Sequence, residues 1–178
     1  MLFRSLYGKL SINSFSGIQM QSPAIQLTAT TANDLETLFE FQRDPEGVFM
    51  AAFTPKNPND IDNYVSRYSG FITDPSIIMM TIWLNDRIVG SISRYVMEGD
   101  HEITYWIDRK YWGRGIATNA LKMFLEIDEI RPLFGRTAID NIGSQRVLQN
   151  NGFLKIGEDS GFANGRQLEL QELIFKLE

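Results

Sequence analysis

The sequence predicts one α/β domain of the α+β kind, built around a mixed but mostly antiparallel sheet. From residue 25 onward, short segments with the two-residue period of strands alternate with segments of helical spacing. Three strand-like segments also follow one another directly in the middle of the chain. No repeat or linker interrupts the pattern, and 178 residues with 43% apolar content suffice for one core. We therefore expect one domain over residues 23–178 and an N-terminal extension over residues 1–22.

The first third of the chain predicts one strand and two helices. Residues 25–30 form the strand, and Asn33 is expected to cap the next helix. That helix should end near Asp44 and Pro45, because proline does not fit a helix interior. The second helix is expected over residues 60–71. The apolar residues expected on the inner faces of the two helices are Leu35, Leu38, Phe39, Phe41, Ile61, Tyr64, Val65 and Tyr68.

The middle of the chain changes to a strand period. Residues 77–84, 87–97 and 101–108 are rich in β-branched and aromatic residues. Residues 85–86 and 98–100 divide them and are of the types that form turns. These features predict an antiparallel meander.

The last third begins with a helix and a short strand. Helical spacing predicts a helix from Ala117, and Pro132 should stop the segment after that helix. Residues 137–139 predict a buried strand. Asn141 is expected to cap another helix, which Gly152 would close in the left-handed conformation.

Two final strands complete the predicted sheet. They are expected over residues 154–158 and 168–177, joined by a loop over residues 159–166. The apolar residues of the last strand change from even to odd positions, which predicts a bulge near Gln171.

Composition argues against several functional classes. A net charge of −5 and a pI near 5.0 do not favour partners such as nucleic acid or anionic membrane. With no cysteine and His101 as the one histidine, disulfides and thiolate metal sites are excluded and we expect no metal. The first twenty residues contain no seven-residue apolar run, which disfavours a secretory signal or membrane span. We expect a cytoplasmic protein.

A glycine turn separates the predicted meander from the next helix. Gly113 and Gly115 let the backbone approach a ligand closely, and a helix N-terminus stabilises a nearby anion by about 0.3–2 kcal/mol. Arg114 can add a charged contact. The turn suits the pyrophosphate of a coenzyme, although two glycines after a strand also make an ordinary tight turn.

Residues 112–117 around the glycine turn form one motif, and Asn141, Ser144 and residues 152–153 form another. Together they make the sequence resemble the GNAT superfamily of N-acetyltransferases, particularly its ribosomal-protein alanine and serine acetyltransferase branch. The first motif, Gln/Arg-x-x-Gly-x-Gly/Ala, falls on residues 112–117, with Trp112 in place of Gln or Arg. The second, Asn-x-x-Ser followed by Gly-Phe, falls on Asn141, Ser144 and residues 152–153. The resemblance covers roughly residues 25–177, and two motifs at matching separation are more specific than either alone.

The resemblance implies a fold and a cofactor. The GNAT fold has six to seven strands and about four helices, and its strands four and five, here residues 101–108 and 136–140, splay apart. Acetyl-CoA would place its pyrophosphate at the glycine turn and its pantetheine arm between those strands. The residues expected to bind it are Tyr105, Trp106, Ile107, Trp112, Gly113, Arg114, Gly115, Ile116, Ala117, Thr118, Asn141 and Ser144.

Direct attack on the thioester requires a neutral amine. A lysine-like amine with a pKa near 10.4 is almost fully protonated at pH 7, whereas deprotonating an α-amine of pKa near 7.7 costs about 1 kcal/mol. Glu102 is the candidate base, because residues 102–106 match the branch pattern Glu-Ile-Gly-Tyr-Trp except at Thr104. The alternative for Glu102 is an ion-paired residue on an exposed strand face. His101 is either a further base or a solvated residue.

The leaving thiolate requires a proton. Many members of the superfamily use a tyrosine seven residues beyond the asparagine, where this chain has Leu148. Ser144 is the candidate substitute, and its alternative role is a hydrogen bond within the helix cap.

We therefore expect an acyl-CoA-dependent N-acetyltransferase that acts on a primary amine of a small molecule or peptide, as a monomer or homodimer. Residues 60–71 and 159–166 are expected to select the acceptor. One alternative is a non-catalytic acyl-CoA sensor. The other is a dinucleotide-binding enzyme, since Asp140 lies near the position of a ribose-binding acid, although Thr118 replaces the third glycine of that motif.

Overall fold

The computed structural model describes residues 24–178, so the expected extension over residues 1–22 lies outside the described residues. The strands are β1 (Ile25–Ala29), β2 (Ile78–Leu84), β3 (Arg87–Met97), β4 (Asp100–Ile107), β5 (Leu133–Ala138), β6 (Leu154–Ala163) and β7 (Leu168–Leu177). The helices are α1 (Leu35–Gln42), α2 (Pro45–Ala51), α3 (Ile61–Thr73), α4 (Ile116–Ile127) and α5 (Ile142–Asn150), with 3₁₀ turns η1 (Ala32–Asp34) and η2 (Arg109–Tyr111). None of the helices within residues 24–178 has the length and apolar content needed to span a membrane.

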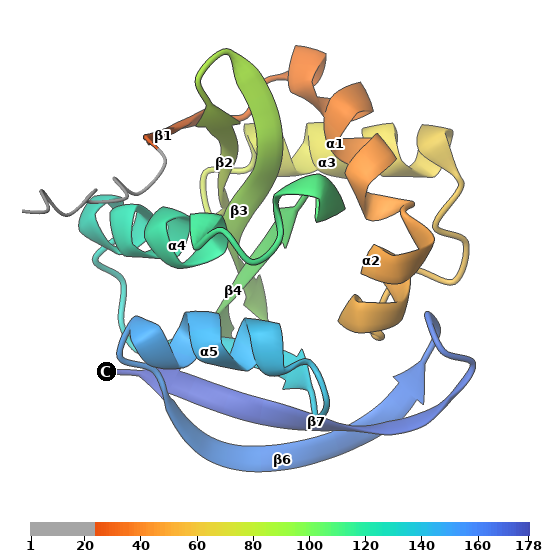
Figure 1. The fold of residues 1–178 in the computed structure, drawn as a ribbon, viewed down its shortest axis with the longest axis vertical. Coiled ribbons are helices and arrows are strands. Elements are labelled where there is room, and N and C mark those ends of the chain that lie inside the picture. The colour runs from red at the N-terminus through yellow and green to blue at the C-terminus, as the bar shows by residue number, and fades with distance from the viewer. Residues whose placement is uncertain (1–23) are drawn as a thin grey trace, which may run out of the picture.

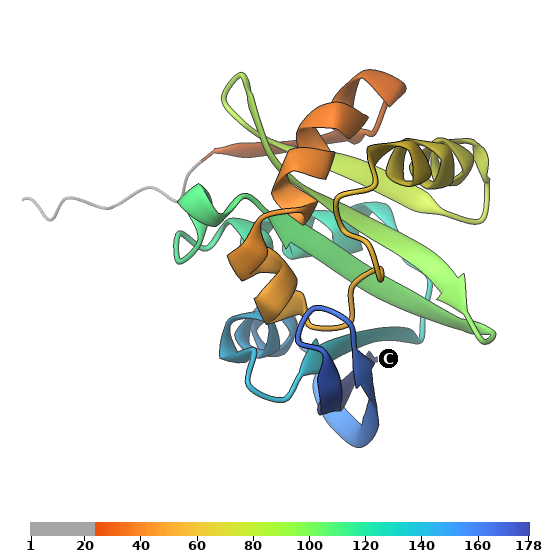
Figure 2. The same cartoon turned by 90° about the vertical axis from the view of Figure 1, so that its right-hand side faces the viewer.

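The strands form one sheet in the order β1-β2-β3-β4-β5-β7-β6. Among the paired strands of residues 24–178, only β4 and β5 run parallel, so the predicted antiparallel meander and the mixed sheet are both confirmed. Helices α1 and α3 cover one face of the sheet, and α4 and α5 cover the other (Figure 1; Figure 2). This sheet does not support the dinucleotide-binding alternative, which requires a doubly wound parallel sheet.

The main core lies between the sheet and helices α4 and α5. Helix α4 buries one stripe, with Phe124 and Leu121 fully inside, as its helical spacing predicted. This stripe packs against Phe175 of β7, Leu148 of α5, and Phe153 from the connection between α5 and β6. The core therefore holds β4, β5 and the start of α4 in fixed relative positions.

The start of α1 differs from the prediction. Asn33 lies inside η1, whose N-cap is Thr31, and the N-cap of α1 is Asp34. Asp34 fixes where η1 begins, because its carboxylate accepts hydrogen bonds from the Thr31 amide at 2.8 Å and from the Thr81 hydroxyl at 3.1 Å. Leu35, the first residue of α1, is buried as predicted.

Helix α2 was not predicted. The pair Asp44-Pro45 ends one helix, as expected, but it also begins another. The Asp44 carboxylate accepts the Gly47 amide at 3.0 Å, and Pro45 occupies the first helical position, where proline is well tolerated.

Helix α3 forms as predicted, with Asp60 capping it through the Asn63 amide at 3.0 Å. Its expected inner face is only partly correct. Tyr64 is buried, whereas Ile61 and Val65 are 39% and 37% exposed. The helix therefore contacts the sheet along a narrower stripe than its apolar spacing indicated.

The last two strands are longer and more regular than predicted. β6 continues to Ala163, which reduces the expected loop over residues 159–166 to a turn over residues 164–167. The bulge lies in β6 at Ile156, between two residues that pair with consecutive residues of β7. Gln171 pairs in register with Ser160, so the prediction of a bulge at Gln171 was wrong.

The shift of apolar positions along β7 has another cause. Leu173 and Phe175 pack into the main core, while Leu170 packs on the opposite face against a small cluster formed by Ala52, Ala138 and Ala163. Both faces of β7 are covered, each over a different part of the strand.

Candidate active site

The glycine turn presents an open helix N-terminus. Gly113 and Gly115 both have φ of +73°, and a Cβ at either position would meet nothing within 4 Å. Gly115 is the N-cap of the twelve-residue helix α4, and no side chain caps it. Trp112 anchors the turn to the preceding strand by donating its indole N–H to the Ile107 carbonyl at 2.8 Å. The turn thus offers free backbone N–H groups to an anion, at the positive end of the helix dipole.

A cleft of about 590 Å³ runs along this turn, between α2, α4 and α5. We call it the coenzyme cleft. The residues predicted to bind the cofactor that line it are Tyr105, Trp106, Ile107, Trp112, Gly113, Gly115, Ile116, Ala117, Thr118, Asn141 and Ser144. Arg114 is outside this lining, and its guanidinium lies 5.3 Å from the ring centre of Tyr111. The open backbone at the two glycines and the uncapped helix suit a pyrophosphate, and the cleft continues toward β4 as a pantetheine arm requires.

Strands β4 and β5 separate beside this cleft. They pair only through Glu102 with Phe134 and Ile103 with Gly135. Beyond Ile103, the edge of β4 that faces β5 has no strand partner within the described residues, so its backbone groups remain available to a ligand. This is the divergence that the resemblance implied.

Two hydroxyl groups meet at the gap. The Tyr105 phenol oxygen lies 2.7 Å from Ser144 Oγ, where either hydroxyl can be the donor, and 3.0 Å from the Ser144 carbonyl oxygen, which can accept the phenol proton instead. Burial raises the pKa of the Tyr105 phenol, and the hydrogen bond to Ser144 opposes that shift. The Ser144 amide, rather than its hydroxyl, takes part in the helix cap, by donating to Asn141 Oδ1 at 3.0 Å. Tyr105 of β4 thus contacts the hydroxyl of Ser144, in the first turn of α5.

A second cavity of about 550 Å³ opens on the face covered by α1 and α3. We call it the acceptor cavity. It shares five lining residues with the coenzyme cleft, namely Ala51, Tyr105, Trp106, Asn141 and Ser144. The two cavities therefore approach the gap between β4 and β5 from opposite sides.

Glu102 lines the acceptor cavity and is only 2% exposed. Arg136 donates to it at 2.9 Å, and the same guanidinium donates to Glu172 at 3.3 Å. Burial raises the pKa of both carboxyl groups, and Arg136 opposes the shift. The alternative given for Glu102 was an ion-paired residue on an exposed strand face. The ion pair is present, but the residue is buried. Thr104, two residues along the same strand, is exposed in this cavity.

Helix α2 closes the coenzyme cleft, and sequence reasoning missed this contribution. Asn141 donates its side-chain N–H to the Met50 carbonyl at 3.0 Å, and a Cβ on Gly47 would lie 2.8 Å from the Trp106 ring. The β6–β7 turn holds the other side of α2, because Arg166 donates to the Phe49 carbonyl at 2.8 Å and pairs with Asp140. The only features of the sequence that pointed to this arrangement were two helix-capping residues, Asp44 and Asn141.

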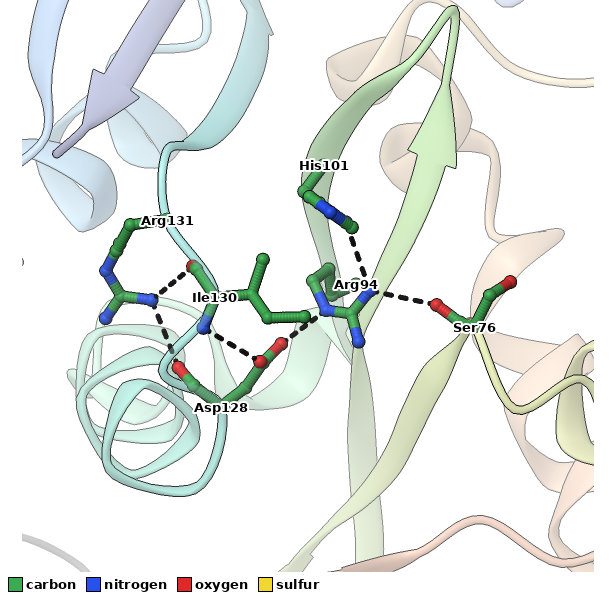
Figure 3. A network of polar contacts seen from close by, with 6 residues as sticks. All are labelled: Ser76, Arg94, His101, Asp128, Ile130 and Arg131. Atoms are coloured by element: carbon green, nitrogen blue, oxygen red, sulfur yellow. Dashed lines mark hydrogen bonds and ion pairs between the residues drawn. The ribbon is translucent and has the colours of Figure 1, made fainter.

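His101 lies outside both cavities. Its Nδ1 is 3.2 Å from an Arg94 nitrogen, and Arg94 also donates to Asp128 and to the Ser76 carbonyl (Figure 3). Arg94 and Asp128 are each 4% exposed. His101 therefore belongs to a buried polar network at the far end of β3 and β4, and its position does not suit a base. Within residues 24–178 no group of three metal-ligating side chains is present.

Comparison with known proteins agrees with this geometry. A family model described as an acetyltransferase (GNAT) domain matches residues 25–154. The ribosomal-protein-serine acetyltransferase of Escherichia coli strain K12 is 31% identical over 86 residues, which are 44% of this chain and 48% of that protein. The match thus spans about half the length of this curated relative.

Solved structures share the fold. A spermidine N-acetyltransferase from Vibrio cholerae in complex with CoA and spermine superposes with a TM-score of 0.71 at 16% identity, covering 85% of this chain and 95% of that one. RimL, a ribosomal L7/L12 alpha-N-protein acetyltransferase in complex with coenzyme A, gives 0.71 at 18% identity, covering 84% and 92%. Together with the family model, which covers most of the described residues, these findings show that the chain belongs to the GNAT acetyltransferase family.

Proposed function

We propose that this protein transfers an acetyl group from acetyl-CoA to a primary amine by direct attack of the amine. The observation that carries the proposal is the meeting of the coenzyme cleft and the acceptor cavity at Tyr105 and Ser144. A protein that only binds the coenzyme has no need for a second cavity at the end of the pantetheine path. Direct transfer between two substrates needs both.

The chain's own groups fit the coenzyme. The N–H groups at the start of α4 would hold the pyrophosphate, and the unpaired edge of β4 beyond Ile103 would hydrogen-bond the pantetheine arm. When bound, acetyl-CoA supplies an activated acyl group as a thioester. Asn141 Oδ1 remains able to accept a further hydrogen bond, and one of the two N–H groups on Asn141 Nδ2 is already given to Met50.

Glu102 is the proposed base on the acceptor side. A carboxylate whose pKa is raised by burial accepts a proton more readily than an exposed one. Arg136 engages one oxygen, Oε1, and so leaves the other for the amine or for an intervening water. Glu102 thereby takes the proton that the amine must lose in order to attack.

The hydroxyl pair is the proposed route for a proton to the sulfur. Ser144 Oγ can donate its proton at the gap while it accepts one from the Tyr105 phenol, so the serine need not become an anion. Burial raises the pKa of the phenol, so the phenol does not ionise beforehand and gives up its proton only as Ser144 protonates the thiolate. Water entering the open cleft then returns a proton to the phenolate. Tyr105 also fixes the serine rotamer.

The acceptor belongs to the class of primary amines, on a peptide N-terminus or a small molecule. The names of the relatives cover both kinds, a ribosomal protein and spermidine. An assay of thiol release from acetyl-CoA against a panel of amines, with the acetylated product identified by mass spectrometry, tests the proposal. Equal amounts of thiol and acetylated amine are expected. Binding of acetyl-CoA without transfer to any amine would favour a non-catalytic sensor.

A further inference from the structure

The acceptor cavity contains two arginines, and only one of them is already neutralised. Arg136 lies 2.9 Å from Glu102, 3.3 Å from Glu172 and 3.6 Å from Asp159. Arg67, on α3, has no carboxylate partner within residues 24–178. Arg67 and Arg136 are the cationic residues of the lining, and Glu102 and Glu172 are the acidic ones. The side of the cavity near Arg136 therefore has excess negative charge, and Arg67 provides the positive charge.

The Arg67 guanidinium rests on aromatic rings. It lies 5.2 Å from the ring centre of Phe71 and 5.9 Å from that of Tyr68, and both rings also line the cavity. Tyr68 is fixed in turn, because its hydroxyl donates to Gln42 at 3.3 Å. Cation–π contacts of this kind favour one position of an arginine side chain and leave its N–H groups able to donate, which suits bidentate binding of a carboxylate.

The two charged regions are separated across the sheet. Helix α3 packs against β2, while Glu102 lies on β4, with β3 between them. Strands in a sheet are about 4.8 Å apart, so the elements that carry the two charges are roughly 10 Å apart before the length of the arginine side chain is considered. Tyr95 of β3, which pairs with Glu102, lines the cavity between these regions, and the buried Ser91 and Ser93 of the same strand line it as well.

We propose that the acceptor is a primary amine that also carries a carboxylate, with its amine beside Glu102 and its carboxylate on Arg67. This inference rests on the proposed acetyl transfer and names the acceptor class. A polyamine would place a second cation beside Arg67, and a neutral amine would leave the guanidinium without a counter-charge. Both alternatives fit this charge distribution less well than an amino acid.

Calorimetry and kinetics with amino acids of graded length test the inference. The probes are L-methionine, 4-aminobutanoate and 6-aminohexanoate, each compared with its primary amide, and spermidine. Calorimetry is done with and without coenzyme A. For at least one chain length the acid should bind about 10- to 100-fold more tightly than its amide, the range expected for a charged hydrogen bond. The acid should likewise have the lower KM.

Arg67→Met should abolish the preference for acids over amides. KM for the acid should rise, while kcat for the acid, and both kcat and KM for the amide, should change little. Arg67→Lys should restore part of it. Arg87→Met, which removes an exposed arginine outside both cavities, is the matched control and should change nothing. A KM effect restricted to acids separates recognition from a general loss of structure.

The outcomes separate this inference from the proposed activity. Binding of an acid that depends on Arg67, without thiol release from any amine, supports the carboxylate site and contradicts the transferase. Equal affinity for acids and amides at every length, preference for spermidine, or a preference for acids that survives in Arg67→Met overturns the inference.

Discussion

The phenol oxygen of Tyr105 lies 2.7 Å from Ser144 Oγ and joins the free end of β4 to the first turn of α5. This contact lies where the two cavities meet. We propose that it takes over the role of the tyrosine that many superfamily members have at the position of Leu148, which here is 1% exposed and packs beside Gly135. A Cβ on Gly135 would lie 2.8 Å from Leu148, so this position belongs to the core.

Removing either hydroxyl should slow transfer far more than it weakens coenzyme binding, although both residues line the coenzyme cleft. We expect Ser144→Ala and Tyr105→Phe each to lower kcat about 10- to 100-fold, the range of a lost proton donor that water partly replaces. The double variant should be little slower than either single variant, because the two groups act as a unit. Steady-state kinetics and calorimetry with acetyl-CoA check this. Tyr64→Phe, a buried tyrosine outside both cavities, is the control. Fully additive losses would contradict the relay.

Glu102→Gln should lower kcat about 100-fold and leave the Kd for acetyl-CoA unchanged. A base must be deprotonated, and burial raises the pKa of Glu102 above its ordinary value of 4.5. The wild-type rate should therefore increase as the pH rises through the pKa of Glu102, which lies above 4.5. This acid limb of the pH–rate profile should disappear in the variant. Asp159→Asn removes an exposed carboxylate near the same arginine and should keep the limb. A variant with an unaltered rate from pH 6 to 9 would exclude Glu102 as the base.

The pair of Arg94 and Asp128 should matter for stability and not for chemistry. Asp128→Ala leaves a buried guanidinium without its counter-charge, so we expect the free energy of unfolding to fall by about 3–5 kcal/mol. Glu129→Ala, at the exposed neighbouring position, should change it by less than about 0.5 kcal/mol. Urea denaturation measures both values. Equal stability of the two variants would show that the network in Figure 3 contributes little.

The features that could be predicted from the sequence are those that depend on residues close together along the chain. The meander follows from alternation over short segments, and the cap by Asn141 follows from its position before α5. The glycine turn was also visible, because two glycines before a helix need no distant partner to adopt a positive φ.

The remaining features depend on residues that are distant in the sequence. Arg136 meets Glu102 and Glu172 from 34 and 36 positions away, and no local pattern pairs them. Helix α2 was missed because Asp44-Pro45 favours the end of one helix and the start of another equally well. Gly161 in β6 favours a loop locally, but pairing with β7 extends the strand through it.

The most direct test of the coenzyme site is a calorimetric titration of acetyl-CoA into Gly115→Glu and Gly99→Glu. Both glycines have positive φ and open space around a Cβ, but Gly99 lies in the β3–β4 turn, outside the coenzyme cleft. The two substitutions thus impose a similar backbone cost and the same added charge. We predict micromolar binding for the wild type and Gly99→Glu and no detectable binding for Gly115→Glu. Unchanged binding by Gly115→Glu would contradict placement of the pyrophosphate at this turn.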